Sequence, residues 1–216
     1  VDTAFKKLFF NVPQNEKPEY NGVQLINSAV IARYLKQLLQ NDLRYAPFTF
    51  IASEMEVDEP IDIQTPKGVI KSRIGGIIDR MDSKDGTLRI VDYKTGGTPK
   101  TPENIEQLFT PADNRPNYIF QTFLYAAILC RKQSLKVAPS LLYIHRAASE
   151  SYSPVIEMGA PRQPKVPVNN FAFFEDEFRE RLHGLLQEIF SQEETFSQTE
   201  DTRKCEYCDF RSLCKR

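Results

Sequence analysis

The stretch RIGGIIDRMDSKDGTLRIVDYKTGG, Arg73–Gly97, decides the interpretation of this sequence. Two apolar segments flank the turn Ser83–Gly86, whose Asp-Gly pair is a strong hairpin signal. Each segment carries a carboxylate among Ile, Val and Leu residues, Asp79 in the first and Asp92 in the second. The sequence therefore predicts a β-hairpin that holds two carboxylates on adjacent strands.

Side-chain alternation predicts which of these residues share a face of the hairpin. Successive side chains of a strand point to opposite faces, so Asp92 and Lys94 lie on the same face. The same rule places Ile77, Asp79 and Met81 together. If the two strands pair through the Asp-Gly turn, Asp79 lies beside Asp92.

Two adjacent carboxylates repel each other, and a hard divalent cation such as magnesium relieves the repulsion with oxygen ligands at about 2.0–2.1 Å. A bound metal polarises a phosphate oxygen and lowers the pKa of a water molecule. Lys94 is then placed to orient that water or to offset negative charge on the phosphate. The backbone carbonyl of Tyr93 is a further candidate metal ligand.

The alternative is a surface hairpin with solvated acidic residues, since Asp-x-Lys alone is a common tripeptide. The glycine pairs Gly75–Gly76 and Gly96–Gly97 favour a functional site, because glycine lets another backbone or a ligand approach closely.

The segments before the hairpin read as helices followed by strands. Apolar spacing predicts a short helix at Phe5–Phe10 and a longer one from Ser28, its N-cap, to the stop at Pro47. Strand composition begins at Phe48, and a second strand is predicted around Lys67–Ile70.

After the hairpin the pattern alternates between helix and strand. Helices are predicted at 118–133 and 173–190, with a strand at 138–147 between them. The order predicts an α/β fold with a mixed central sheet flanked by helices. We expect one domain, 1–216, with a helical part at 1–47, a core at 48–146 and a C-terminal helix and tail at 147–216.

The composition is that of an ordinary globular domain. The chain has 216 residues with 41% hydrophobic and 26% charged residues, enough for one sizeable core. A net charge of −1 gives no bulk signature of a nucleic-acid binder, although a local basic groove is compatible with it. No apolar run approaches the roughly 18 residues of a membrane span. Because the chain begins at Val1 rather than Met, we expect it to be part of a longer polypeptide.

Three of the four cysteines, Cys205, Cys208 and Cys214, crowd into the C-terminal tail with the spacing C-x2-C-x5-C. A disulfide framework spreads its cysteines through a small secreted domain, so this pattern favours a reduced, cytoplasmic compartment with a metal or cluster site. Cys130, inside an apolar helix, is expected to be a small buried hydrophobe.

The hairpin motifs resemble those of the RecB-like branch of the PD-(D/E)xK nuclease superfamily, G-x-x-D-R-x-D followed by I-x-D-Y-K-T-G. The branch also carries a helical Gln-x-x-x-Tyr motif, supplied here by Gln121 and Tyr125. The resemblance implies a restriction-endonuclease-like core, a DNA substrate, and Asp79 and Asp92 as ligands of Mg²⁺ or Mn²⁺ with Lys94 as the catalytic lysine. Gln121 and Tyr125 would contact a DNA phosphate or steady the site. Taken alone, they are the polar edge of a partly buried helix.

The superfamily often adds an upstream acidic ligand, for which Glu54 is the candidate and Glu56 the alternate. It also often carries a histidine in an earlier helix. This chain has no histidine before Asp79, since His145 and His183 both come later.

The cysteine tail resembles that of AddB-type nucleases and of CRISPR-associated RecB-like exonucleases, where one upstream cysteine completes a [4Fe-4S] site with three at the C-terminus. The resemblance implies that Cys205, Cys208 and Cys214 bind such a cluster, with the fourth ligand expected before Val1. Zinc is one alternative to the cluster, and three reduced, unligated thiols in the tail are another.

These features together predict a metal-dependent DNA nuclease domain, expected to be an exonuclease, of an AddB- or RecB-like recombination-repair protein with a helicase–nuclease partner subunit and no membrane association. Three alternatives stay open. The domain could bind DNA or act as a scaffold without activity, it could be a stand-alone CRISPR-associated exonuclease, or it could be an interaction module built on a zinc tail.

Overall fold

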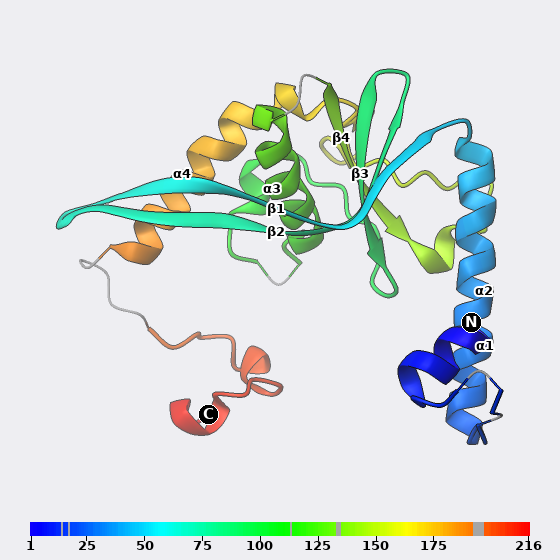
Figure 1. Ribbon diagram of the computed structural model, residues 1–216. Helices are drawn as coiled ribbons and strands as arrows, with labels where there is room; N and C mark the ends of the chain where they lie inside the picture. The colour runs from blue at the N-terminus through cyan, green and yellow to red at the C-terminus, as the bar shows by residue number, and fades with distance from the viewer. Residues whose placement is uncertain (14, 17, 113, 133–134, 192–196) are drawn as a thin grey trace.

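The computed structural model describes residues 1–216 except 14, 17, 113, 133–134 and 192–196. At its centre lies a four-stranded sheet in the order β1-β2-β3-β4 (Figure 1). The β1–β2 and β2–β3 pairs are antiparallel and the β3–β4 pair is parallel, so the predicted mixed sheet is confirmed. The strands are β1 (Thr49–Thr65), β2 (Gly68–Lys84), β3 (Thr87–Lys94) and β4 (Lys136–Tyr143).

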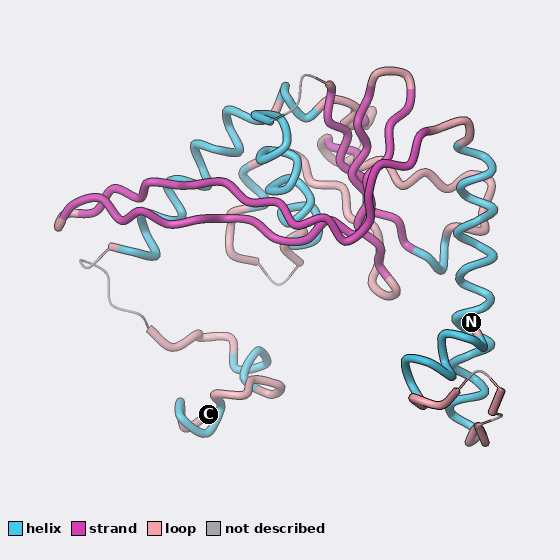
Figure 2. Tube along the Cα trace, in the orientation of Figure 1, coloured by secondary structure: helices cyan, strands magenta, loops and turns pink. Residues whose placement is uncertain are grey.

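Helices flank both faces of this sheet (Figures 1 and 2). On one face α3 (Asn117–Lys132) and α4 (Glu175–Phe190) share the main core with the strands, through side chains such as Ile90 and Phe123. On the other face Tyr34 of α2 (Gly22–Tyr45) packs against a second buried cluster, which includes Val91, the residue after Ile90 in β3. Successive side chains of β3 point to opposite faces of the sheet and thus pack into two separate cores.

The long first helix begins earlier than predicted. Its N-cap is Asn21 rather than Ser28, because Asn21 Oδ1 accepts the Gln24 N–H while Gln24 Oε1 accepts the Asn21 N–H. This reciprocal capping box satisfies two N–H groups that the first turn leaves free. The helix ends at Tyr45, before Pro47, as predicted.

The two strands predicted at Lys67–Ile70 and after Arg73 are one continuous 17-residue strand, β2. Together with β1 it forms a long hairpin that projects from the sheet and runs along α4 (Figure 2). Ile61 and Ile63 of this arm are buried. Packing against α4 therefore supports the pairing of β1 with β2 far beyond the central sheet.

The predicted strand at 138–147 ends at Tyr143, where the chain turns into the 3₁₀ turn η3 and takes His145 and Arg146 out of the sheet. The helix predicted at 118–133 ends at Lys132, and Gln133 lies outside the described residues. In the described part of the chain no helix is long and apolar enough to cross a membrane. The remaining elements are α1 (Asp2–Ala4), η1 (Phe5–Phe9), η2 (Glu106–Leu108), η3 (Ile144–Arg146), β5 (Glu157–Met158), β6 (Val166–Pro167), η4 (Phe171–Phe173), η5 (Thr202–Cys205) and α5 (Arg211–Cys214).

A buried ion pair fastens the hairpin arm to the helices. The Arg179 guanidinium in α4 donates to both carboxylate oxygens of Glu59 in β1, with N–O distances of 2.5 and 3.2 Å. It also donates to Glu175 and to the carbonyl of Ala127 in α3. Arg179 and Glu59 are only 7% and 6% exposed, so removing either charge leaves the other buried and unpaired.

Arg179→Ala should therefore lower the free energy of unfolding by about 3–5 kcal/mol, because Glu59 loses its partner in a buried place. Arg181→Ala is the matched control, since its partners Glu177 and Glu106 are both exposed and such pairs contribute less than about 1 kcal/mol each. Urea denaturation followed by circular dichroism measures both. If both variants lose the same free energy of unfolding, the buried pair does not contribute more to stability than an exposed one.

Candidate active site

The fold brings the two hairpin aspartates together. Asp79 Oδ2 accepts a hydrogen bond of 2.7 Å from the backbone N–H of Tyr93, the residue that follows Asp92. The charge on Asp79 is close enough to contribute to raising the Asp92 pKa. The hairpin thus holds two carboxylates within electrostatic contact at one place.

The predicted common face of Ile77, Asp79 and Met81 is wrong, because β2 is irregular at Asp79. Ile78 and Met81, three positions apart, both belong to the main core, whereas Ile77 is 52% exposed. Asp79 has no partner in the described ladders with β1 and β3. At this position the carboxylate of Asp79 accepts a hydrogen bond from the N–H of Tyr93 on β3.

Asp92 and Lys94 lie on one face of β3, as alternation predicts. Lys94 Nζ is 2.5 Å from Asp92 Oδ2, and the same ammonium group lies 4.2 Å from the centre of the Tyr118 ring. Asp92 is 5% exposed. Its Oδ2 has no hydrogen bond of good geometry among the described residues, although the ammonium group is near. The cation that this oxygen faces in the described structure is the Lys94 ammonium.

Burial is the first cause of the raised Asp92 pKa, since it disfavours the charged carboxylate. The Lys94 ammonium opposes this effect, and the Asp79 charge adds to it. The net direction is upward, so a single lysine does not fully offset the cost of holding this carboxylate charged. A second positive charge at Asp92 would lower that cost.

The helical motif completes the cluster from α3. Lys94 Nζ approaches Gln121 Oε1 at 3.4 Å, and Gln121 Nε2 donates to the Tyr125 hydroxyl at 3.0 Å. Gly76 of β2 makes room for this row, because a Cβ at its position would lie 2.6 Å from the Tyr125 oxygen. Its neighbour Gly75 faces the β1 backbone, where a Cβ would lie 2.1 Å from the Val57 carbonyl oxygen.

The donor set fits a magnesium-type cation. Magnesium is commonly held by one or two carboxylates and several waters, and Asp79 and Asp92 supply two carboxylates, one of which faces the Lys94 ammonium. The structure groups no third His, Cys, Asp or Glu with them within the described residues.

The candidate upstream ligand Glu54 does not join this group. Its neighbours Ser53 and Met55 pair with Arg80 and Ile78, so it lies at the level of Asp79, with a positive φ of 51° that marks the irregularity on β1. Glu54 and its alternate Glu56 are both exposed. Their role as ligands stays a prediction.

The three tail cysteines do not converge either. Cys205, Cys208 and Cys214 are free thiols, partly or fully exposed, and no group of three metal-binding side chains forms among the described residues. The arrangement as it stands does not fit a cluster or a zinc ion, which take four ligands. Cys130 is half-buried, and burial raises the pKa of its thiol to about 11, as expected of a packing residue.

Sequence reasoning missed Tyr118 and Tyr143. Tyr118 shares a helical face with Gln121 and Tyr125 at the spacing i, i+3, i+7, a signal that was available in the sequence. Tyr143 is the register partner of Lys94 in the parallel β3–β4 pair. No local pattern reveals that pairing, because 41 residues of intervening chain separate the two strands (95–135).

A family model described as the PD-(D/E)XK nuclease superfamily matches residues 1–215, and the chain belongs to that superfamily. Over 121 residues it is 29% identical to an ATP-dependent helicase/deoxyribonuclease subunit of Streptococcus uberis. That match covers 54% of this chain and only 9% of the relative. The crystal structure of SSO0001 aligns over 86% of this chain and 67% of its own, with 14% identity and a TM-score of 0.31, too low to support a structural argument.

In the metal-free protein the Asp92 carboxyl should titrate above the usual range of an aspartate. The folded state then binds a proton more tightly than the unfolded chain, so the stabilising effect of this group is present at low pH and is lost as pH rises through its folded pKa. Lys94→Ala should raise the Asp92 pKa further, because the ammonium favours the charged form. Carboxyl ¹³C NMR measures both titrations.

The control for this titration is Lys36→Ala, which removes an exposed lysine from α2 on the other side of the sheet. It should leave the Asp92 titration unchanged. A Lys94→Ala variant with an unaltered or lower Asp92 pKa would show that the ion pair has no electrostatic influence on the carboxylate.

Proposed function

We propose that this chain is a divalent-metal-dependent DNA nuclease domain that hydrolyses phosphodiester bonds. The observation that carries the proposal is the cluster of Asp79, Asp92, Lys94 and Gln121 from two strands and one helix, in a member of a nuclease superfamily.

Asp79 and Asp92 would hold the metal ion, which when bound polarises a phosphate oxygen and lowers the pKa of a water molecule. The Tyr93 carbonyl is the proposed further ligand. The hydrogen bond from the Tyr93 N–H fixes one Asp79 oxygen, so the other oxygen stays free for coordination. Before metal binding, the charge of Asp92 is partly offset by Lys94.

Lys94 would supply positive charge next to the phosphate as negative charge develops on it. Its ammonium group is restricted by the Gln121 oxygen and the face of the Tyr118 ring, which reduces the conformational freedom lost on binding. Gln121 is in turn oriented by the Tyr125 hydroxyl. Gln121 and Tyr125 are thus positioning residues for the lysine.

The relative's name supports a larger context for this domain. We propose that it is the nuclease part of a helicase–nuclease protein of recombination repair, that it works beside a partner subunit, and that it degrades DNA from an end. The helicase, deoxyribonuclease and subunit parts of this proposal rest on the partial match to the streptococcal protein, and recombination repair and degradation from an end rest on the resemblance of the motifs.

Asp92→Ala and Lys94→Ala should each reduce cleavage of linear DNA in magnesium or manganese by at least about 100-fold, because each removes a charge that acts in the transition state. Asp62→Ala, which removes an exposed aspartate from the hairpin arm, should cleave like the wild type. Cleavage of labelled single- and double-stranded DNA measures all three. Wild-type activity no greater than that of either site variant would refute the nuclease proposal for this chain.

A metal-binding role of the tail cysteines also stays a prediction, and it requires a fourth ligand. Metal analysis and absorbance near 400 nm in anaerobically purified protein, compared between the wild type and a Cys205, Cys208 and Cys214 to Ser variant, distinguish an iron–sulfur cluster from zinc. If the wild type binds no more iron or zinc than the triple variant does, the three cysteines are free thiols.

A further inference from the structure

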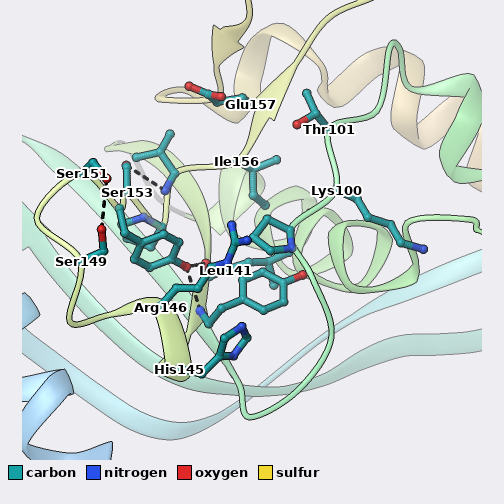
Figure 3. Close-up of a pocket in the computed structure, with 15 residues that line it drawn as sticks. Lys100, Thr101, Leu141, His145, Arg146, Ser149, Ser151, Ser153, Ile156 and Glu157 are labelled. Carbon is teal, nitrogen blue, oxygen red and sulfur yellow. Dashed lines mark hydrogen bonds between the residues drawn. The ribbon is translucent and has the colours of Figure 1, made fainter. Parts of the chain in front are cut away.

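A pocket of about 530 Å³ opens next to the candidate active site (Figure 3). Its walls come from the loop after β3, the last residues of β4, the turn η3 and the loop 149–157. None of Asp79, Asp92, Lys94 and Gln121 lines it. The volume lies in the ~300–1,000 Å³ range of small-ligand pockets, enough for one nucleotide.

The pocket lies on the same face of the sheet as the cluster. Leu141 and Tyr143, which line it, are the register partners of Asp92 and Lys94 in the parallel β3–β4 pair. Register partners on neighbouring strands project to the same face, and the strands are about 4.8 Å apart. The pocket therefore begins one strand away from the carboxylate and the lysine.

A second, smaller hollow of about 320 Å³ adjoins the pocket, since Tyr143 and Lys100 line both. Gly97 lies between aromatic rings, where a Cβ would be 3.5 Å from Tyr118 and 3.9 Å from Tyr143. The Tyr118 ring in turn contacts the Lys94 ammonium group. Tyr118 thus contacts Lys94 and lines the second hollow, which meets the pocket at Tyr143, a residue that is only 2% exposed.

Arg146 provides the positive charge of this pocket. Its side chain reaches into the pocket in Figure 3, and its guanidinium has no hydrogen bond or ion pair with the residues that the structure describes. The floor beneath it is apolar and the rim carries hydroxyls. The floor includes Leu141, Tyr152, Pro154 and Ile156, and the hydroxyls belong to Ser149, Ser151 and Ser153.

Fixed hydrogen bonds hold the floor in place. The Tyr152 hydroxyl accepts the Tyr143 N–H at 2.8 Å and donates to the Leu141 carbonyl at 2.9 Å, so its ring is anchored to β4. Lys100 points away from the pocket in Figure 3, and its ammonium group donates to the backbone carbonyls of Asn114 and Arg115.

We propose that this pocket binds one nucleotide of a single DNA strand next to the nucleotide whose phosphate is cleaved, with the base on the apolar floor and the phosphate on Arg146 and the serine hydroxyls. Proteins hold single strands by this combination of apolar or aromatic floor and cationic side chain. The inference rests on the proposed function for the position of the scissile phosphate, and the binding itself is tested without cleavage.

The binding test uses fluorescein-labelled oligothymidylates of increasing length in EDTA, with affinity measured by fluorescence anisotropy. Arg146→Ala should weaken binding about tenfold, because it removes a charge-assisted hydrogen bond. It should also reduce the slope of log affinity against log salt concentration by about 0.7, the value for one phosphate contact on a single strand. Arg146→Lys should keep that slope.

Arg33→Ala is the matched control, because Arg33 is an exposed arginine of α2, the helix on the opposite face of the sheet. It should bind every oligonucleotide like the wild type. The melting temperatures of the Arg146 and Arg33 variants should equal that of the wild type, because both side chains are exposed. Equal affinities of Arg146→Ala and Arg33→Ala would overturn the proposal, as would a wild type that binds no oligonucleotide.

Two further measurements separate this proposal from its rivals. In magnesium, Arg146→Ala should raise KM for a short single strand more than it lowers kcat, because it removes binding away from the reacting atoms. Free dTMP should not displace the oligonucleotide at equal concentration, and displacement would overturn the proposal in favour of a mononucleotide site.

If the wild type cleaves DNA but Arg146→Ala binds oligonucleotides as tightly as the wild type, the nucleotide pocket is refuted and the nuclease proposal is not. The expected Arg146 effect on binding without wild-type cleavage supports the pocket and refutes the nuclease proposal.

Discussion

Asp92 carries its charge in a nearly buried position beside a second carboxylate, and the site is organised around the cost of that charge. Burial and Asp79 both disfavour the ionised form, while Lys94 favours it from 2.5 Å away. A strand that holds such a residue needs a cation on the same face, and the Asp-x-Lys spacing supplies one without any contribution from another element. The remaining imbalance is what a metal ion, in the proposed function, would relieve.

Close packing between β2 and its neighbours lets α3 take part in this balance. Gly75 lies against the β1 backbone and Gly76 against the Tyr125 hydroxyl, at distances that no Cβ would permit. Because the helix can approach the strand at Gly76, Gln121 reaches the lysine and Tyr125 reaches Gln121. The glycines in the motif are therefore explained by steric room, and the polar residues on the helix by the charge they restrain.

The parallel β3–β4 pair extends the surface beyond the cluster. It places Leu141 and Tyr143 beside Asp92 and Lys94, and the early end of β4 turns Arg146 toward the same side. The chain's net charge of −1 gave no sign of positive charge at this surface, because the fold brings only a few cationic side chains, such as Lys94 and Arg146, to one side. In the proposed function, a DNA strand bound at Lys94 would pass Tyr118 before it reaches Arg146.

Local sequence patterns were sufficient for the hairpin, the shared face of Asp92 and Lys94, the apolar helices and the α/β class, because alternation, turn chemistry and helical spacing act over a few residues. The capping box at Asn21 and Gln24 and the position of Tyr118 were also readable but were overlooked. Tertiary structure alone decided the irregularity at Asp79, the burial of Glu59 against Arg179 and the neighbourhood of Lys94 and Tyr143. Each of these depends on contacts between residues far apart in the chain, where the free energy of packing and of buried charge outweighs local preference.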